Sequence, residues 1–123
     1  VMACFRLPKV TDEDKLSRKA AIDAATLFAA EVPYETAKIA VDLLELLPDL
    51  ARHGNANAVT DVGVAGLLAS AAAKGALFNV EINLNSLPPE AGGHIRESLQ
   101  VLKEASRLYS RQVMDAVRDR MES

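Results

Sequence analysis

The chain of 123 residues contains one cysteine, no tryptophan, three phenylalanines and two tyrosines. Because Cys4 stands alone, no disulfide can close within the chain, and we expect a reducing, cytoplasmic compartment. Neither sign of charge dominates, since 14 basic and 17 acidic residues give a net charge of −3. Half of the residues are hydrophobic, which argues against a disordered protein, and the acidic balance argues against a nucleic-acid partner.

Long hydrophobic runs are also missing. The most apolar stretch, residues 62–78, is interrupted by Ser70 and Lys74 and is shorter than the roughly 20 residues that a membrane span needs. The first residues, VMACFRLPK, lack the basic region and apolar run of a signal peptide. We therefore expect a buried helix over residues 62–78 and no membrane partner.

Several motifs that would indicate a particular chemistry are absent. The chain has no GxGxxG, no P-loop, no GxSxG and no HExxH motif. Its two histidines, His53 and His94, are far apart in sequence and there is one cysteine, so we expect no metal site.

The composition favours helices, because 21 residues are alanine and β-branched and aromatic residues are scarce. Four helical segments are predicted. The first begins at the N-cap Thr11 and ends at Pro33, and the second runs from about Tyr34 to Arg52, where Pro48 should kink or interrupt it. We predict a single all-α domain over residues 1–123, an antiparallel bundle of about four long helices.

The second predicted segment is apolar on two sides and should lie between neighbouring helices. One stripe comprises Ala37, Val41 and Leu44, and the other comprises Ile39, Leu43, Leu46 and Leu50. The sequence His53-Gly54-Asn55 is a plausible C-terminal stop, where Gly or Asn can adopt the left-handed conformation.

The third segment follows Thr60 and Asp61, which offer a cap, and it contains Gly63, Gly66 and Gly75. Each glycine costs about 1 kcal/mol in a helix relative to alanine. We expect the close approach of another helix or a ligand to offset this cost. The segment should therefore be the central helix of the bundle. The fourth segment carries a heptad seam of Ile95, Leu99, Leu102, Ser106, Tyr109, Val113 and Ala116.

Polar residues gather at both ends of the third segment. Asn55, Asn57 and Asp61 lie at its start, while Asn79 and Asn83 are four residues apart and share a face near its end. In one interpretation these side chains cap turns and helix starts. In the other they line a binding cleft.

The stretch GNANAVTDVGVAGLLASAAAKGALFNVEINL resembles the signature of the cyclodeaminase domain of formiminotransferase-cyclodeaminases. It equally resembles that of the bacterial relatives described as methenyltetrahydrofolate cyclohydrolases. The blocks FRLPK, EVPYETA and LLPDLARHGNAN fit in the same order, so the similarity covers essentially the whole chain. Family domains also carry an N-terminal portion with a PGGGS-type turn, and we expect this chain to be the C-terminal part of a larger helical domain.

The resemblance implies an all-helical, dimeric enzyme of folate one-carbon metabolism. A cyclodeaminase lets N10 attack the formimino carbon on N5 with loss of ammonia, whereas a cyclohydrolase adds water to the methenyl carbon. The sequence leaves both activities, lyase and hydrolase, open. The tetrahydrofolate derivative is the substrate, no tightly bound cofactor is expected, and a formiminotransferase domain is a further expected partner.

The resemblance also suggests roles for the polar residues. Asp61 is the candidate general acid or base, although its carboxylate could instead bind adjacent N–H groups of the pterin or cap the third helix. Arg6 and Lys9 could contact the anionic glutamate tail, unless they are simply solvated. Four amides suit a ring whose edges both donate and accept hydrogen bonds: Asn55, Asn57, Asn79 and Asn83.

The alternative is a non-catalytic helical dimerisation module, in which the small-residue helix and the heptad seam mediate assembly. An enzyme needs Asn55, Asn57 and Asp61 to converge on a cleft with free side chains, whereas an assembly module uses them as caps. The order of four matching blocks favours the enzyme.

Overall fold

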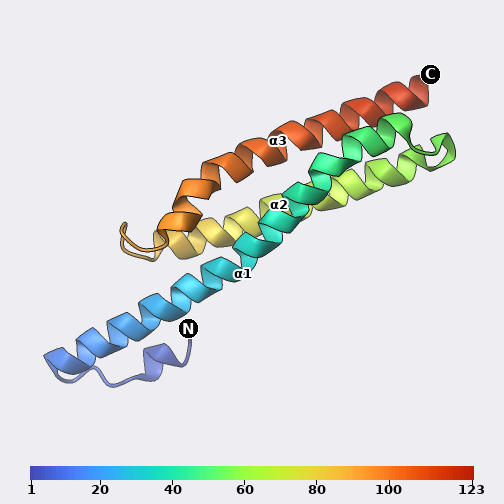
Figure 1. Cartoon of the computed structure of the whole chain (residues 1–123). Coiled ribbons are helices and arrows are strands. Elements are labelled where there is room, and N and C mark those ends of the chain that lie inside the picture. Colours follow the sequence, from blue (N-terminus) through green and yellow to red (C-terminus); the bar gives the residue numbers. More distant parts are fainter.

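The computed structural model describes all 123 residues and consists of helices joined by turns (Figure 1). In chain order the elements are η1 (Cys4–Arg6), α1 (Asp12–His53), η2 (Ala56–Ala58), α2 (Val59–Asn85) and α3 (Gly93–Glu122). The predicted all-α class is confirmed. The predicted count of four long helices is wrong, because the first two predicted segments form the single helix α1.

Neither Pro33 nor Pro48 ends α1. A proline inside a helix removes one N–H and crowds the carbonyl four residues back, at a cost of about 3 kcal/mol. Burial around the prolines offsets this cost, and the buried residues of α1 are Thr26, Ala30, Tyr34, Ala37, Ala40, Val41, Leu44, Leu47, Pro48 and Ala51. Tertiary packing therefore overrides the local signal for a helix end.

The two ends of α1 are where the sequence predicts them. Thr11 is the N-cap, and its hydroxyl accepts from the Asp14 amide while the Asp14 carboxylate accepts from the Thr11 amide, which forms a capping box. Gly54 is the C-cap and donates to the Leu50 carbonyl at 2.8 Å. Its φ of −75° is ordinary, so the stop does not use the left-handed conformation.

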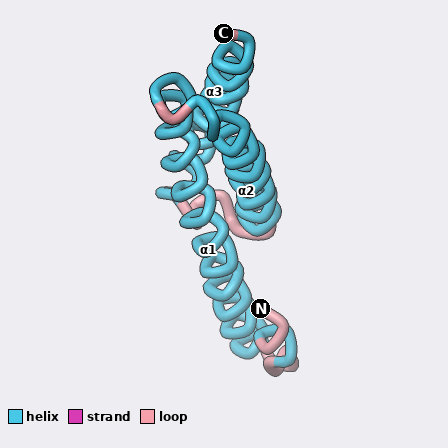
Figure 2. Tube along the Cα trace, turned by 90° about the vertical axis from the view of Figure 1, so that its right-hand side faces the viewer, coloured by secondary structure: helices cyan, strands magenta, loops and turns pink.

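The N-terminal part of α1 projects beyond the other two helices (Figures 1 and 2). The segment before α1 folds back along it, where Cys4 Sγ donates to the Ala21 carbonyl at 3.5 Å. The Arg18 guanidinium lies 5.3 Å from the centroid of the Phe5 ring. The FRLPK block is therefore held at the projecting end of the molecule.

The three helices run up, down and up, and each packs on the other two. The predicted seam of α3 faces this core, with Ile95 and Val113 fully buried. On α2, a Cβ at Gly66 would lie 2.6 Å from Val113 Cγ1, so this glycine permits the predicted close approach. The same expectation is wrong for Gly75, whose Cβ would have no neighbour within 4 Å.

Both α1 and α2 leave an apolar stripe exposed. The outer stripe of α1 comprises Val32, Ile39, Leu43, Leu46 and Leu50, and that of α2 comprises Val64, Leu67, Leu68, Phe78 and Ile82. The second predicted stripe of α1 is thus uncovered, and α2 is enclosed on one face only. The segment Ala56–Asn85 has the length and hydropathy of a membrane span, but its inner face packs on α1 and α3.

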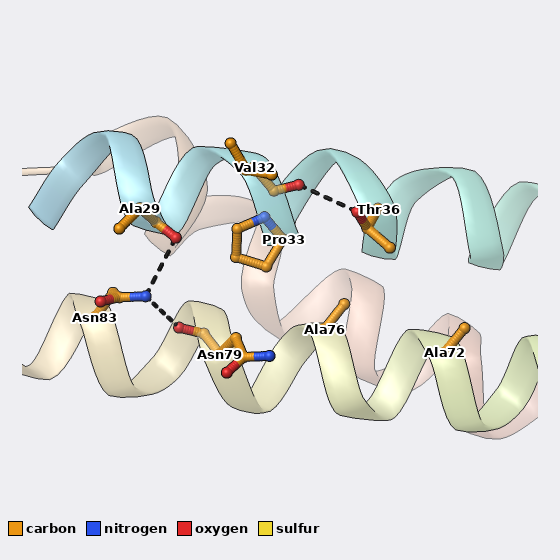
Figure 3. A pocket seen from close by; sticks show the side chains of 8 residues that line it. All are labelled: Ala29, Val32, Pro33, Thr36, Ala72, Ala76, Asn79 and Asn83. Carbon is orange, nitrogen blue, oxygen red and sulfur yellow. Dashed lines mark hydrogen bonds between the residues drawn. The ribbon is translucent and has the colours of Figure 1, made fainter. Parts of the chain in front are cut away.

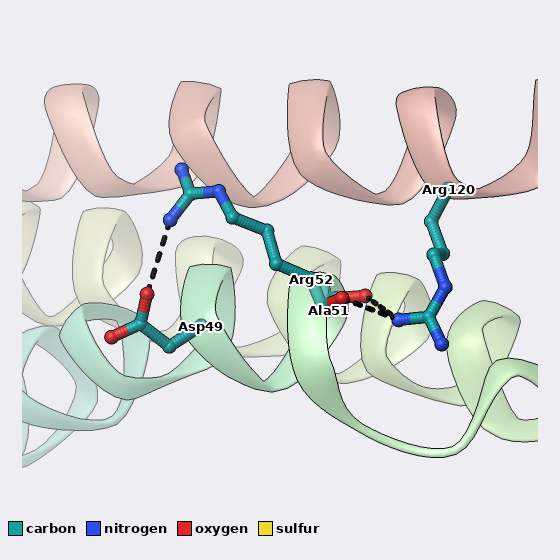
Figure 4. A network of polar contacts seen from close by, with 4 residues as sticks. All are labelled: Asp49, Ala51, Arg52 and Arg120. Carbon is teal, nitrogen blue, oxygen red and sulfur yellow. Dashed lines mark hydrogen bonds and ion pairs between the residues drawn. The ribbon is translucent and has the colours of Figure 1, made fainter. Parts of the chain in front are cut away.

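An arginine of α3 fastens the turn between α1 and α2. The Arg120 guanidinium donates to the carbonyls of Ala51, Arg52 and Gly54 at 2.9, 2.7 and 2.8 Å, and Figure 4 shows the first two of these bonds. The last carbonyls of a helix have no partner within the helix, so these bonds satisfy the C-terminus of α1.

A second arginine does the same at the other end of the bundle. Arg96 donates to the carbonyls of Leu84, Ala91 and Pro88 at 2.9, 2.7 and 3.3 Å. It thereby holds the turn that leads from α2 into α3, in which Gly92 has a φ of +71°.

Candidate functional site

A groove between α1 and α2 contains two of the predicted site residues (Figure 3). Its volume of about 490 Å³ lies within the usual range for small-molecule sites. We call it the Asn groove, and its lining residues are Ala29, Val32, Pro33, Thr36, Ala72, Ala76, Asn79 and Asn83. The small alanine side chains leave this space between the helices open.

Pro33 explains the structural role of Asn83, one of the two asparagines of the groove. Since proline has no N–H, the Ala29 carbonyl lacks its partner within α1. Asn83 Nδ2 donates to this carbonyl at 3.2 Å and to the Asn79 carbonyl of α2 at 2.9 Å (Figure 3). The donors of Asn83 are thus engaged in structural bonds, while its Oδ1 takes no part in them.

The other polar groups of the groove also keep free acceptors. Asn79 Nδ2 donates to the Gly75 carbonyl at 3.3 Å, and Thr36 Oγ1 donates to the Val32 carbonyl at 3.3 Å. Oxygen lone pairs of Asn79, Asn83 and Thr36 therefore remain for a ligand that carries N–H groups. No lining residue of the groove is ionisable.

A second hollow, of about 330 Å³, lies at the other end of the same helix pair. Its lining residues are Leu47, Leu50, Gly54, Asn55, Ala58, Asp61, Val62 and Ala65. We call it the Asp61 hollow. It brings Asp61 together with Asn55, whereas Asn57 does not line it.

The capping interpretation is confirmed for Asn55 and wrong for Asp61. Asn55 Oδ1 accepts from the Asn57 amide at 2.9 Å and so caps η2. The N-cap of α2 is Ala58, which provides no side-chain hydrogen bond, and Asp61 follows in the first turn of the helix. The exposed Asp61 carboxylate is therefore not the helix cap, and neither is Thr60.

The Asn groove and the Asp61 hollow are far apart. Asp61 and Asn79 lie on the same face of α2, but about five helical turns, or about 27 Å, separate them. A ligand the size of a pterin cannot contact both residues of one chain. Arg6 and Lys9 lie elsewhere again, in the segment beside the projecting part of α1.

Sequence reasoning missed the contribution of α1 to the Asn groove. Pro33 and Thr36 belong to the EVPYETA block, and from the sequence Pro33 is predicted to end one helix and open the next, with no part in a site. The signal that could have found them is the unpaired carbonyl that a mid-helix proline creates, which requires a donor such as Asn83 from a neighbouring helix.

One ionisable group on this part of α1 has a shifted pKa. A hydrogen bond with the Glu35 side chain is the main cause that raises the pKa of Lys38, while desolvation acts in the opposite direction. The Lys38 ammonium also lies 4.8 Å from the centroid of the Tyr34 ring. Lys38 is therefore a persistent cation, but it does not line the groove.

The residues that match known proteins include those that line the Asn groove and the Asp61 hollow. A sequence model of the family described as formiminotransferase-cyclodeaminase matches residues 1–107. A methenyltetrahydrofolate cyclohydrolase of Methylorubrum extorquens is 35% identical over 113 residues, which are 90% of this chain and 54% of that protein. A formimidoyltransferase-cyclodeaminase of Sus scrofa is 31% identical over 120 residues, which are 97% of this chain and 22% of that protein. The chain thus spans about half the length of the first relative and less of the second.

Proposed function

The chain belongs to the formiminotransferase-cyclodeaminase family, and on that premise we propose that it acts in tetrahydrofolate one-carbon metabolism. It is part of a formimidoyltetrahydrofolate cyclodeaminase or a methenyltetrahydrofolate cyclohydrolase, and the reacting carbon is the one that bridges N5 and N10. The observation that carries this proposal is the Asn groove, which lies wholly within the matched residues.

The Asn groove is the binding site for the pterin ring. Its alanine and proline surfaces accommodate a flat ring between α1 and α2. The side-chain oxygens of Asn79 and Asn83 accept from ring N–H groups. The carboxamide of Asn83 is held in a fixed orientation by its bonds to the Ala29 and Asn79 carbonyls. Because the Asn83 amide is already oriented before the ligand binds, little side-chain entropy of this residue is lost on binding.

Both reactions require a proton to move to or from nitrogen, and the groove has no ionisable residue of its own. Asp61 is the candidate carboxylate, and it lies on the same face of α2 about 27 Å away. Two copies of α2 packed antiparallel, with a two-fold axis midway between these positions, would bring the partner's Asp61 to Asn79. A homodimer would therefore complete two equivalent sites.

The exposed stripe of α2 supports this arrangement. Between Asp61 and Asn79 the outer face of the helix presents Leu68, Ala72 and Gly75. Leu68 is 68% exposed, and the space above Gly75 is open, so a second helix can approach closely there. Contiguous exposed apolar surface of this kind marks a contact region.

The outer stripe of α1 is left for other parts of a larger helical domain or for a formiminotransferase domain. In this proposal the assembled enzyme is cytoplasmic, as the single cysteine suggests.

The test is an absorbance assay for 5,10-methenyltetrahydrofolate, run with the formimino and the methenyl substrate. Formation from the first identifies a cyclodeaminase, and loss of the second, above the uncatalysed rate, identifies a cyclohydrolase. Asn79→Ala should raise the KM for either substrate. Asn85→Ala is the matched control, because Asn85 is also exposed on α2 but lies outside the groove.

A helical dimerisation module without catalysis is the second candidate. The exposed stripes of α1 and α2 and the engagement of Asn55 as a cap favour it. It predicts an intact dimer with no turnover of either substrate, which the same assay detects.

A further inference from the structure

A third hollow lies between α2 and α3, on the side of α2 that faces away from the Asn groove. Its volume is about 290 Å³. It is lined by Lys74, Leu77, Phe78 and Glu81 of α2 and by Lys103, Ser106 and Arg107 of α3. We call it the Ser106 hollow, and nothing in the folate proposal uses it.

Ser106 is a buried polar residue without a partner. The residue is 2% exposed, and its hydroxyl makes no hydrogen bond. Two other serines of α3 are satisfied: Ser98 donates to the carbonyl of His94 four residues back, and Ser110 donates to Ser70 across the helix pair. A buried hydroxyl left unpaired is destabilising, and at the wall of a hollow a ligand atom can satisfy it.

The charges around the hollow indicate what that atom is. Lys103 forms an ion pair with Glu81, which removes one cation and one anion. Lys74 and Arg107 are exposed, and neither belongs to an ion pair. Two uncompensated cations thus flank a buried hydroxyl on a protein whose net charge is −3.

We propose that the Ser106 hollow binds an oxyanion, the carboxylate or phosphate group of a small molecule. The Ser106 hydroxyl donates to an anion oxygen, and the Lys74 ammonium and the Arg107 guanidinium balance its charge. Hydrogen bonds to a charged acceptor are stronger than neutral ones, which compensates for desolvation of the anion. Leu77 and Phe78 form an apolar wall for the carbon part of the ligand.

The test measures the melting temperature and the amide NMR spectrum of the protein in millimolar inorganic phosphate or succinate. Sodium chloride at equal ionic strength is the reference. A rise in melting temperature with phosphate alone identifies a phosphate site, and a rise with succinate alone identifies a carboxylate site. The shifted amides should cluster around Ser106 and Arg107. No rise over chloride with either anion contradicts the proposal.

Variants distinguish binding of the anion in the Ser106 hollow from a general effect of charge on stability. Ser106→Ala should raise the melting temperature of the anion-free protein by a few degrees, because it removes the unpaired hydroxyl, and should abolish the anion response. Arg107→Gln should reduce the response severalfold. Arg111→Gln, one turn further along α3 and outside the hollow, is the control. An anion response that is equal in all three variants overturns the proposal.

Discussion

Asn83 of α2 donates its side-chain amide to the backbone carbonyl of Ala29 in α1, across 3.2 Å. This carbonyl is the one that Pro33 deprives of its helical partner. A residue that would weaken an isolated helix is thus compensated by a neighbouring helix, and the pair forms one end of the Asn groove (Figure 3).

Asn83→Ala should destabilise the protein by about 1–3 kcal/mol, because it leaves the Ala29 carbonyl unpaired. Chemical denaturation of the variant measures this free energy of unfolding. Asn79→Ala is the control and should cost less, since the Asn79 amide bonds only to a carbonyl of its own helix. In a Pro33→Ala background the carbonyl regains a helical donor, so Asn83→Ala should then be nearly neutral. Equal costs in both backgrounds would refute the compensation.

The sequence alone predicts the helical class, the cap at Thr11, the stop at Gly54 and the seam of α3, because each depends on residues close together in the chain. It does not predict that α1 continues without a break past Pro33. The residue that compensates for that proline, Asn83, is 54 positions away from Ala29, and no local pattern connects the two.

The same limit applies to the candidate site. The spacing of Asn79 and Asn83 predicts a shared face, and both residues line the groove. The sequence also places Asp61 at the opposite end of the same helix, and α2 runs without a break from Val59 to Asn85. It does not show that α1 forms the other wall of the groove. Which glycines allow close packing depends likewise on the neighbouring helix and not on the glycines themselves.

Gly66→Ala should destabilise the protein by about 1–3 kcal/mol, because the new Cβ would meet the fully buried Val113 at 2.6 Å. Gly75→Ala, in the same helix, should be neutral or stabilising by up to about 1 kcal/mol when both variants are compared as monomers, in a Leu68→Glu background, since its Cβ meets no atom of its own chain. Thermal unfolding of both variants tests this difference. A similar loss for the two would show that the α2–α3 contact is not tight at Gly66.

Arg120→Ala should loosen the turn between α1 and α2 by removing donors to three carbonyls. We expect a loss of about 1–2 kcal/mol, below the upper range for charged hydrogen bonds because the site is partly exposed. Hydrogen exchange at Gly54 and Asn55 should also accelerate. Arg118→Ala is the control, since Arg118 is exposed and pairs only with Asp115. Unchanged exchange in Arg120→Ala would mean that the turn is held by other contacts.

Leu68→Glu should dissociate the proposed homodimer, because it places a charge in the middle of the outer α2 stripe. Sedimentation velocity measures the loss of dimer. Val101→Glu on α3, where Val101 is 65% exposed, should leave assembly unchanged. Dimers that persist in Leu68→Glu would place the interface on another surface.

The most direct measurement of the central claim is turnover of the folate substrate by mixed variants. With the substrate well below the KM, Asn79→Ala and Asp61→Asn should each lose most activity as homodimers. If each site combines Asn79 of one copy with the partner's Asp61, a mixed dimer contains one intact site. An equimolar mixture that has exchanged subunits should then recover about a quarter of wild-type turnover, since half of the dimers are mixed and half of their sites are intact. A mixture no more active than its components, or a wild type that turns over neither substrate, would contradict the account.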